Sequence, residues 1–169
     1  IPLGMFDSAQ RHLEEFEGLV RDFGDLDLIV SLEFLKGELA FKEGNNKTAI
    51  RNYKSALRII QEAHLNSETS ILPELGKAHL ANGEPEAALK ATTKGANLHR
   101  ARLFAVSEVV PSQLIWWRHT QALVANKKTK EANESLQLAY KFLLESIQNI
   151  QDEGLRRNYL NKVKLNRDI

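Results

Sequence analysis

Histidine is the side chain with the widest chemical repertoire in this sequence, because imidazole can bind a metal or move a proton near neutral pH. The five histidines are spread along the chain, at positions 12, 64, 79, 99 and 119. No two are four residues apart and none belongs to a His-Glu-x-x-His pair, so their spacing excludes a metal site on one helix. A site shared by His79 and His119 is geometrically conceivable, but we interpret both as packing or helix-end residues.

Nucleophile and acid–base patterns are missing as well. There is no cysteine, no G-x-S-x-G elbow around any serine, and no glycine-rich phosphate loop of the G-x-x-x-x-G-K-[ST] type. Glu14 and Glu15 are adjacent, so their carboxylates diverge around a helix. We interpret them as part of a solvent-exposed helix face and not as a general acid–base pair. The sequence therefore predicts a protein that is not an enzyme and that uses no cofactor or metal.

Charge gives no strong preference for a polyanionic partner, since 23 Lys and Arg residues nearly cancel 22 Asp and Glu residues. Basic residues do gather near the C-terminus, at positions 156, 157, 162, 164 and 167, but Tyr159 is the only aromatic among them. We interpret them as favourable charges at helix ends and as partners of neighbouring acids, and expect neither nucleic-acid nor membrane binding.

No apolar run approaches the roughly 20 residues that span a bilayer, and no signal peptide precedes the first helical pattern. Together with the lack of cysteine, this favours a cytoplasmic location. The sequence has no initiator Met and its first element reads as half a repeat, so we expect a fragment of a longer polypeptide. Residues 1–4 alternatively derive from cloning.

Two amphipathic helices joined by a tight turn form the central pattern of the chain. Apolar residues recur at helical spacing from Leu32 to Ala40 and again from Ala49 to Ile60. Gly44-Asn45-Asn46 separates the two segments, which predicts an antiparallel helical hairpin. Small residues such as Gly37 and Ala49 stand where the helices would cross.

The same spacing recurs twice. Gly37, Ala49 and Tyr53 align with Gly76, Ala88 and Thr92 at an offset of 39, and these align with Thr120, Ala132 and Leu136 at an offset of 44. Ala9, Leu13 and Phe16 fit the second half of one further copy, 40 residues ahead of Ala49. Such a period indicates stacked helical hairpins, each too small to bury its apolar face alone.

This spacing resembles the tetratricopeptide repeat. Leu75-Gly76 matches its Leu-Gly pair, Trp116 its early aromatic residue, and Ala49, Ala88 and Ala132 its central alanine. Lys36 and Thr92 depart from the pattern, no copy ends in proline, and the periods exceed the usual ~34 residues. The resemblance implies an all-α, right-handed superhelix of helical hairpins.

The predicted units follow in chain order. They are a half repeat at 7–23, hairpins at 27–64, 67–101 and 112–150, and a capping helix within 152–169. Asp7 and Ser112 are predicted N-caps because each precedes a helical pattern, and Asp152 is predicted to cap the terminal helix. We read residues 103–111 as a helix end followed by an apolar joint.

A second resemblance covers roughly residues 113–169. The Trp116-Trp117 pair and the later series Leu155-Arg156-Arg157, Leu160, Val163 and Asn166-Arg167 are similar to the C-terminal end of helical-repeat regions in large bacterial multidomain regulators. In those proteins such repeats follow an ATPase module that is joined to a signalling or transcriptional output domain. The likeness implies a regulatory role and leaves the output domain open.

The tetratricopeptide resemblance also implies a binding groove. Its ligand-facing positions correspond here to Ser31, Phe34, Glu38 and Phe41; Ser70, Pro73, Lys77 and Leu80; and Leu114, Trp117, Gln121 and Val124. Phe34, Phe41 and Trp117 would form an apolar stripe, with Lys77 and Arg118 as nearby cations and with Glu38 and Gln121 alongside. Alternatively, the aromatic residues only pack against the next repeat.

We therefore expect a protein-interaction or regulatory module that binds a protein, a peptide or a neighbouring domain of its parent chain. An apolar stripe favours an amphipathic helix over an acidic tail. Two alternatives remain open. One is a sensor in which a small ligand or peptide switches a linked ATPase or output domain, and the other is self-association into a homo-oligomer.

Overall fold

The computed structural model describes residues 3–105, 110–148 and 150–169. Within these ranges all regular structure is helical and there is no strand. The helices are α1 (Leu3–Phe23), α2 (Leu26–Lys42), α3 (Asn46–Glu62), α4 (Glu68–Ala81), α5 (Pro85–Ala101), α6 (Ser112–Ala125), α7 (Thr129–Gln148), α8 (Glu153–Lys162) and α9 (Lys164–Asp168). In this part of the chain, no helix is both long enough and apolar enough to cross a membrane.

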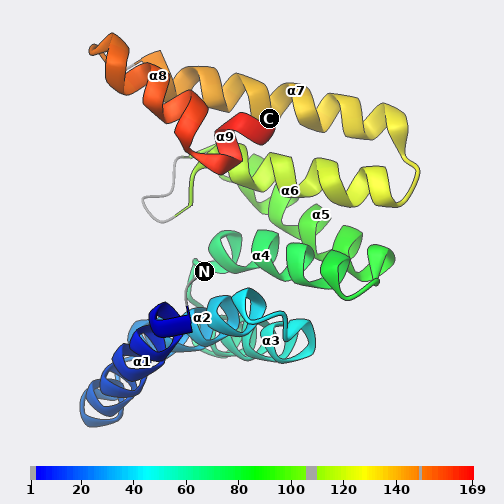
Figure 1. Cartoon of the computed structure of the whole chain (residues 1–169). Coiled ribbons are helices and arrows are strands. Elements are labelled where there is room, and N and C mark those ends of the chain that lie inside the picture. The colour runs from blue at the N-terminus through cyan, green and yellow to red at the C-terminus, as the bar shows by residue number, and fades with distance from the viewer. Residues whose placement is uncertain (1–2, 106–109, 149) are drawn as a thin grey trace.

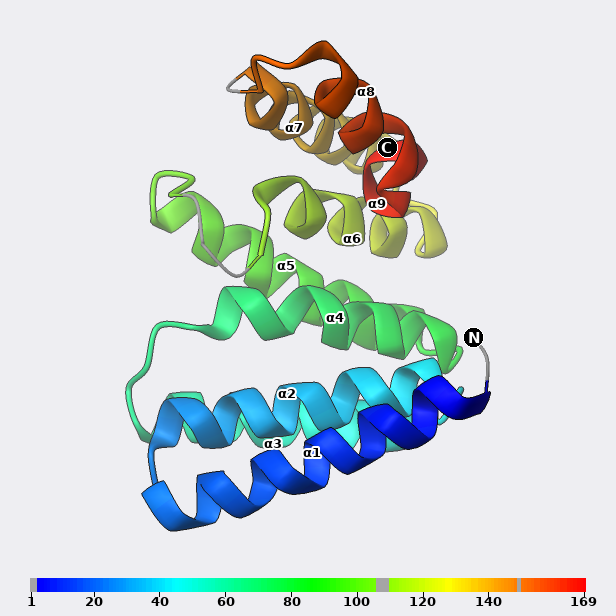
Figure 2. The ribbon, with the colours of Figure 1, turned by 60° about the vertical axis from the view of Figure 1, so that its left-hand side comes forward.

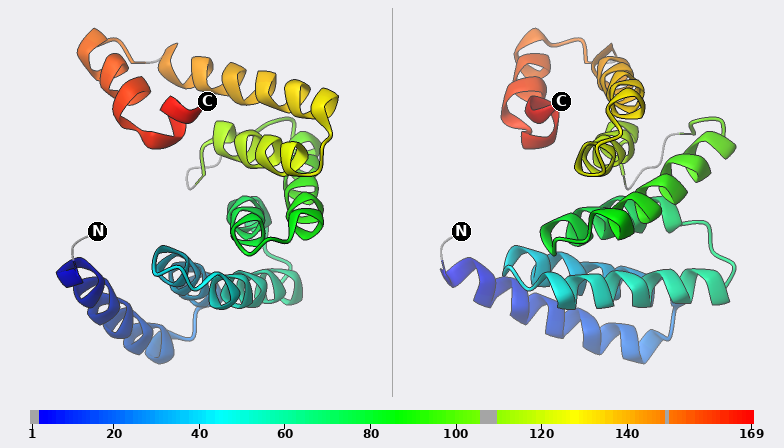
Figure 3. Two further views of the ribbon diagram at one scale, coloured as in Figure 1. Left: turned by 45° about the vertical axis from the view of Figure 1, so that its right-hand side comes forward. Right: turned by 90° about the vertical axis from the view of Figure 1, so that its right-hand side faces the viewer.

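Three antiparallel helix pairs, α2/α3, α4/α5 and α6/α7, follow one another through the structure (Figure 1). Each pair packs on the next, mainly through α3 against α4 and α5 against α6, and α4 also contacts α6. Helix α1 lies against α2 at one end, and α8 and α9 follow α7 at the other (Figure 2). The helices trace a curved path, and both chain ends lie on its open side (Figure 3, left).

Small residues let the two helices of a pair approach closely. A Cβ atom added to Gly37 on α2 would lie 2.6 Å from Cε1 of Tyr53 on α3, and one added to Gly76 on α4 would overlap the methyl group of Thr92 on α5. The crossing positions predicted for the first two hairpins are therefore confirmed. In the third pair Thr120 takes this position, and its hydroxyl donates to the Trp116 carbonyl at 2.9 Å.

The alanines that recur in the sequence lie inside the pairs. Ala49 and Ala88 are fully buried and Ala132 is nearly so. The turn before each alanine reverses the chain through one residue with positive φ, which is Gly44 (81°), Gly83 (76°) or Lys127 (60°). Glycine adopts this left-handed conformation without a steric penalty, which explains why two of the three turns use it.

Two predicted N-caps are wrong. Helix α1 begins at Leu3, so Asp7 lies inside it. Pro111 occupies the N-cap position of α6, and Ser112 is the first residue of that helix. The Ser112 hydroxyl instead lies 3.1 Å from Nε2 of His99. The prediction for Asp152 is confirmed, because its carboxylate accepts a hydrogen bond from the Leu155 N–H at 2.7 Å.

A buried cluster around His99 and Trp116 joins the second pair to the third. The Trp116 indole N–H donates to Nδ1 of His99 at 3.0 Å. The rings of Phe104 and Phe142 flank the imidazole at centroid distances of 5.5 and 5.4 Å. Leu103 and Phe104 reverse the chain with positive φ. Part of the predicted apolar joint, residues 106–109, lies outside the described residues.

Helices α8 and α9 fold back toward α6 through a buried polar contact. The side-chain amide of Gln113 donates to the Tyr159 hydroxyl at 3.0 Å and to Oδ1 of Asn166 at 3.4 Å. The Asn166 amide donates to the Tyr159 carbonyl at 3.0 Å. Leu155 of α8 is 61% exposed, so the predicted capping helix covers the end of the stack incompletely.

Candidate functional site

A recess of about 520 Å³ lies between α2, α4, α6 and α9. It is lined by Glu38, Phe41, Lys42, Lys77, Trp117, Arg118, Gln121, Lys164, Leu165 and Asp168. Six of the seven groove residues singled out from the sequence are among them, although they come from three different helix pairs. The seventh, Phe34, is not part of this lining and packs against the core.

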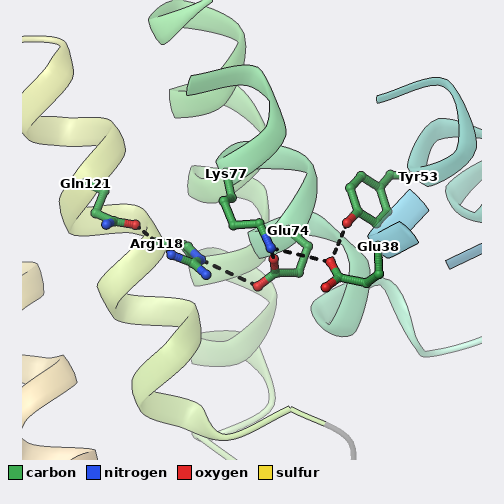
Figure 4. Close-up of polar contacts among 6 residues, drawn as sticks. All are labelled: Glu38, Tyr53, Glu74, Lys77, Arg118 and Gln121. Atoms are coloured by element: carbon green, nitrogen blue, oxygen red, sulfur yellow. Dashed lines mark hydrogen bonds and ion pairs between the residues drawn. The ribbon is translucent and has the colours of Figure 1, made fainter. Parts of the chain in front are cut away.

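A chain of polar contacts crosses the floor of the recess (Figure 4). The buried Tyr53 hydroxyl donates to Glu38. The Lys77 ammonium lies 3.4 Å from Oε1 of Glu38 and also contacts Glu74. Arg118 completes the chain by donating from Nε to Oε1 of Glu74 at 3.4 Å. The contacts therefore connect α2, α3, α4 and α6.

The repeat explains why these charges meet. Glu38 directly follows the crossing residue Gly37, and Lys77 directly follows Gly76. Stacking of the hairpins brings such equivalent positions together on the first helix of each pair, here α2 and α4. Glu74 and Arg118 likewise share one position in successive hairpins. The sequence period thus places complementary charges side by side on the first helices of consecutive hairpins.

Glu74 is the most deeply buried charge of the site, with a residue exposure of 6%. Its carboxylate is flanked by Lys77 and Arg118, which offset the cost of burying it. The Lys77 ammonium also lies 4.2 Å from the centre of the Phe41 ring, a cation–π contact. Arg118 donates in addition to Oε1 of Gln121 at 3.0 Å. Both cations are thereby held in fixed positions.

The electrostatics of Tyr53 favour a structural role for its hydroxyl. Burial raises the pKa of Tyr53 strongly, and the hydrogen bond to the Glu38 carboxylate raises it further. The phenol therefore stays protonated and continues to donate to Glu38 across the ordinary pH range. This contact fixes the Glu38 carboxylate at the edge of the recess.

The apolar part of the recess is smaller than the predicted stripe. Phe41 and Trp117 line it, whereas the Phe34 ring packs 5.9 Å from the Tyr53 ring. Phe34 therefore contacts the second helix of its own hairpin, whereas the alternative that we left open was packing against the next repeat. Ser70 and Pro73, two of the other positions implied by the resemblance, are also buried.

The sequence did not predict four of the residues that line the recess, nor Glu74 beneath it. Glu74 stands one helical turn before Lys77, so a search for oppositely charged pairs on one helix could have found it. Lys164, Leu165 and Asp168 come from α9, which no periodicity connects with α2 or α6. Lys42 follows Phe41 directly, but the resemblance implies no ligand-facing role at its position.

The arrangement is chemically suited to binding. Among the described residues, no three His, Asp or Glu side chains are grouped so that they could hold a metal ion. The carboxylates of Glu38 and Glu74 face cations or a phenol, and no serine belongs to the lining of the recess. The recess offers two aromatic surfaces and a mixed charged rim to a ligand.

The predicted packing role of His79 and His119 is confirmed, since both are buried. Nδ1 of His119 lies 3.2 Å from the Thr92 hydroxyl. That hydroxyl donates to the Ala88 carbonyl, so it accepts from a neutral His119. Burial lowers the pKa of His119 to about 4, and the charge of Arg100 contributes to the shift.

This lowered pKa predicts an acid-sensitive fold. Below pH 6.5 the unfolded chain binds a proton at position 119 that the folded chain excludes, so stability is complete above that pH and falls as the pH drops toward 4. The free energy of unfolding of both proteins should fall between pH 7 and pH 5. We expect this fall to be about 2 kcal/mol smaller for a His119→Gln variant than for the parent. Urea unfolding at both pH values measures this difference, and parallel losses in the two proteins would contradict the assignment.

Comparison of the chain with protein-family models, with curated proteins and with solved structures found no match. The function of the recess therefore has to be inferred from its own residues.

Proposed function

We propose that the chain is a right-handed, tetratricopeptide-like array that acts as a non-enzymatic interaction module of a larger bacterial signalling or transcription-regulating protein. Its concave recess would bind an amphipathic helix of a partner or of a neighbouring domain. One observation carries the proposal: five of the twelve residues given by repeat position, which come from three different hairpins, line a single recess together with the neighbouring Arg118.

The composition of the recess supports a helical or peptide ligand. Phe41 and Trp117 are only partly exposed, yet both remain accessible at the lining. Because part of each ring is already buried, enclosure of the remainder by a ligand would contribute less than the figure of about 1.5–3 kcal/mol for a side chain that passes from full exposure to full burial. Lys42, Lys164 and Asp168 supply charges of both signs at the rim, which suits a ligand with an apolar face and polar flanks.

A second candidate is a sensor for a small ligand. The recess volume of about 520 Å³ lies within the range of small-molecule sites, and α9 contributes to its wall. In this case ligand binding would shift the linked ATPase or output domain between two states, which requires different affinities for those states.

Random-peptide display against the full 169-residue chain tests the first candidate. We expect selected peptides to bind a Trp117→Ala variant at least tenfold more weakly, because an aromatic surface of the recess is lost. Tyr140→Ala, which truncates an aromatic residue that is 53% exposed on α7, should leave the affinity unchanged. Fluorescence polarisation with labelled peptides measures both.

Equal affinities for the parent and the Trp117→Ala variant would refute binding at the recess. Lys77 and Arg118 are unsuitable for this test, because truncating either leaves the buried Glu74 carboxylate with one cation fewer. A metabolite screen by thermal shift addresses the sensor. A hit whose effect disappears in Trp117→Ala, with no peptide selected, would favour the second candidate.

A further inference from the structure

A second concave surface lies between α1 and α2 and adjoins the recess, with which it shares Glu38 and Lys42. It encloses about 430 Å³, and its apolar lining includes Phe6, Ala9, Leu13 and Phe16 of α1 and Leu35 and Leu39 of α2. Leu35 is 45% exposed, although the side chains of α3 that recur at helical spacing, such as Tyr53 and Ile60, are fully buried. Within the part of the chain that the structure describes, an apolar groove is therefore left uncovered at this end of the stack.

The hairpins show what covers the corresponding surface elsewhere. Ala9 occupies the repeat position of Ala49, Ala88 and Ala132, whose exposures are 0%, 0% and 4%. Those three alanines lie on the second helix of a pair, where the first helix packs over them. Ala9 is exposed, because α1 has the pattern of a second helix without a first helix packed against it.

The glycine of the hairpin turns has a counterpart at the start of α1. Gly44, Gly83 and Lys127 have positive φ and stand five residues before the buried alanines. Gly4 stands five residues before Ala9. In the structure Gly4 belongs to α1, yet its position is the one at which the other second helices connect to their first helices.

Charge completes the description of what would fit. Lys77 contacts Glu38. Each of these residues directly follows the crossing glycine of its helix, which is Gly76 for Lys77 and Gly37 for Glu38. Glu38 also lines the groove between α1 and α2. A helix stacked on the other side of α2 would bring its own residue after the crossing position toward the same carboxylate, and a cation there would be complementary.

We propose that this groove is the seat of one antiparallel amphipathic helix, which connects to α1 through a tight turn at Gly4. The helix would carry a small residue where it crosses α1 at Leu13, a cation directly after it, and apolar residues at helical spacing on either side. This inference goes beyond the proposed function, because it rests on the register of the hairpins and concerns a different surface from the recess.

Grafting a first helix onto the chain tests the proposal. Residues 1–3 are replaced by a copy of residues 67–82, so that α4 and its turn lead directly into Gly4. The parent has no cysteine, so Ala9→Cys in both chains reports the accessibility of the groove to a thiol reagent. We expect modification at least tenfold slower in the grafted chain, together with a higher unfolding midpoint.

The matched control is the grafted chain with a tryptophan substitution, Gly76→Trp, in the copied segment only, which blocks close approach of the two helices at the crossing. Its cysteine at position 9 should react as fast as that of the ungrafted chain. The copied segment added as a free peptide gives a second measurement, in which rising concentration should slow the labelling of the ungrafted Ala9→Cys chain.

Equally fast labelling in the grafted and control chains, with no effect of the peptide, would overturn the proposal. Protection of Ala9→Cys in the ungrafted chain, accompanied by a doubled mass in solution, would also overturn it by assigning the groove to a second copy. Either result leaves peptide binding at the recess untouched, so the two hypotheses fail separately.

Discussion

A Trp116→Ala variant is expected to lose about 3–5 kcal/mol of unfolding free energy, the largest effect we predict for a single substitution. Trp116 is fully buried, and its surroundings include Ala96, Ala139 and Phe142. Its truncation would leave a cavity between the second and third helix pairs. It would also leave Nδ1 of His99 without its indole donor and remove the ring beneath the Arg100 guanidinium, 4.6 Å away.

Urea unfolding followed by circular dichroism measures this loss. Trp116→Phe should be intermediate, losing about 1–2 kcal/mol, because a ring remains while the hydrogen bond to His99 is removed. Tyr140→Ala, on an exposed face of α7, should stay within about 0.5 kcal/mol of the parent. A loss below about 1 kcal/mol for Trp116→Ala would show that this cluster does not hold the two pairs together.

A Gly76→Ala variant should lose about 3 kcal/mol, although alanine is normally the better helix former. The added methyl group would overlap that of Thr92, so the α4 and α5 backbones would have to separate. Thr92→Ser removes the opposing methyl group and retains the hydroxyl that donates to Ala88. The double variant Gly76→Ala/Thr92→Ser should therefore recover at least half of the loss.

Gly18→Ala is the matched control, because the new Cβ atom would meet nothing within 4 Å. It should stabilise the protein by up to about 1 kcal/mol through helix propensity alone. Thermal and urea unfolding of Gly76→Ala, Thr92→Ser, the double variant and Gly18→Ala measure these changes in stability. If Gly76→Ala were as well tolerated as Gly18→Ala, the close crossing of α4 and α5 would be wrong.

The first two hairpins were predictable because two local signals agree at each of them, whereas the third has Lys127 at the position with positive φ. Apolar residues recur at helical spacing, and a residue suited to positive φ, such as Gly44 or Gly83, interrupts the pattern. The N-caps were less predictable. Asp7 is not a cap because the helix continues to Leu3, and the Ser112 hydroxyl lies against His99, a residue 13 positions away.

The candidate site was predictable where it follows the repeat. Glu38, Lys77 and Gln121 share one position, so a single period brings all three to the same face. The contribution of α9 was not predictable, because its fold-back involves Gln113 and Asn166, which are 53 residues apart and outside any periodic pattern. Phe34 has a groove position but packs against Tyr53. The tetratricopeptide assignment stays a prediction.

The central claim, that the recess formed by successive hairpins binds a ligand, can be tested at single-residue level because the chain has two tryptophans. Trp117 lines the recess, whereas Trp116 is buried and donates to His99. In ¹⁵N–¹H spectra recorded while a selected peptide is added, the Trp117 indole resonance should shift and that of Trp116 should stay in place. Saturable binding that leaves the Trp117 resonance unmoved would contradict the account.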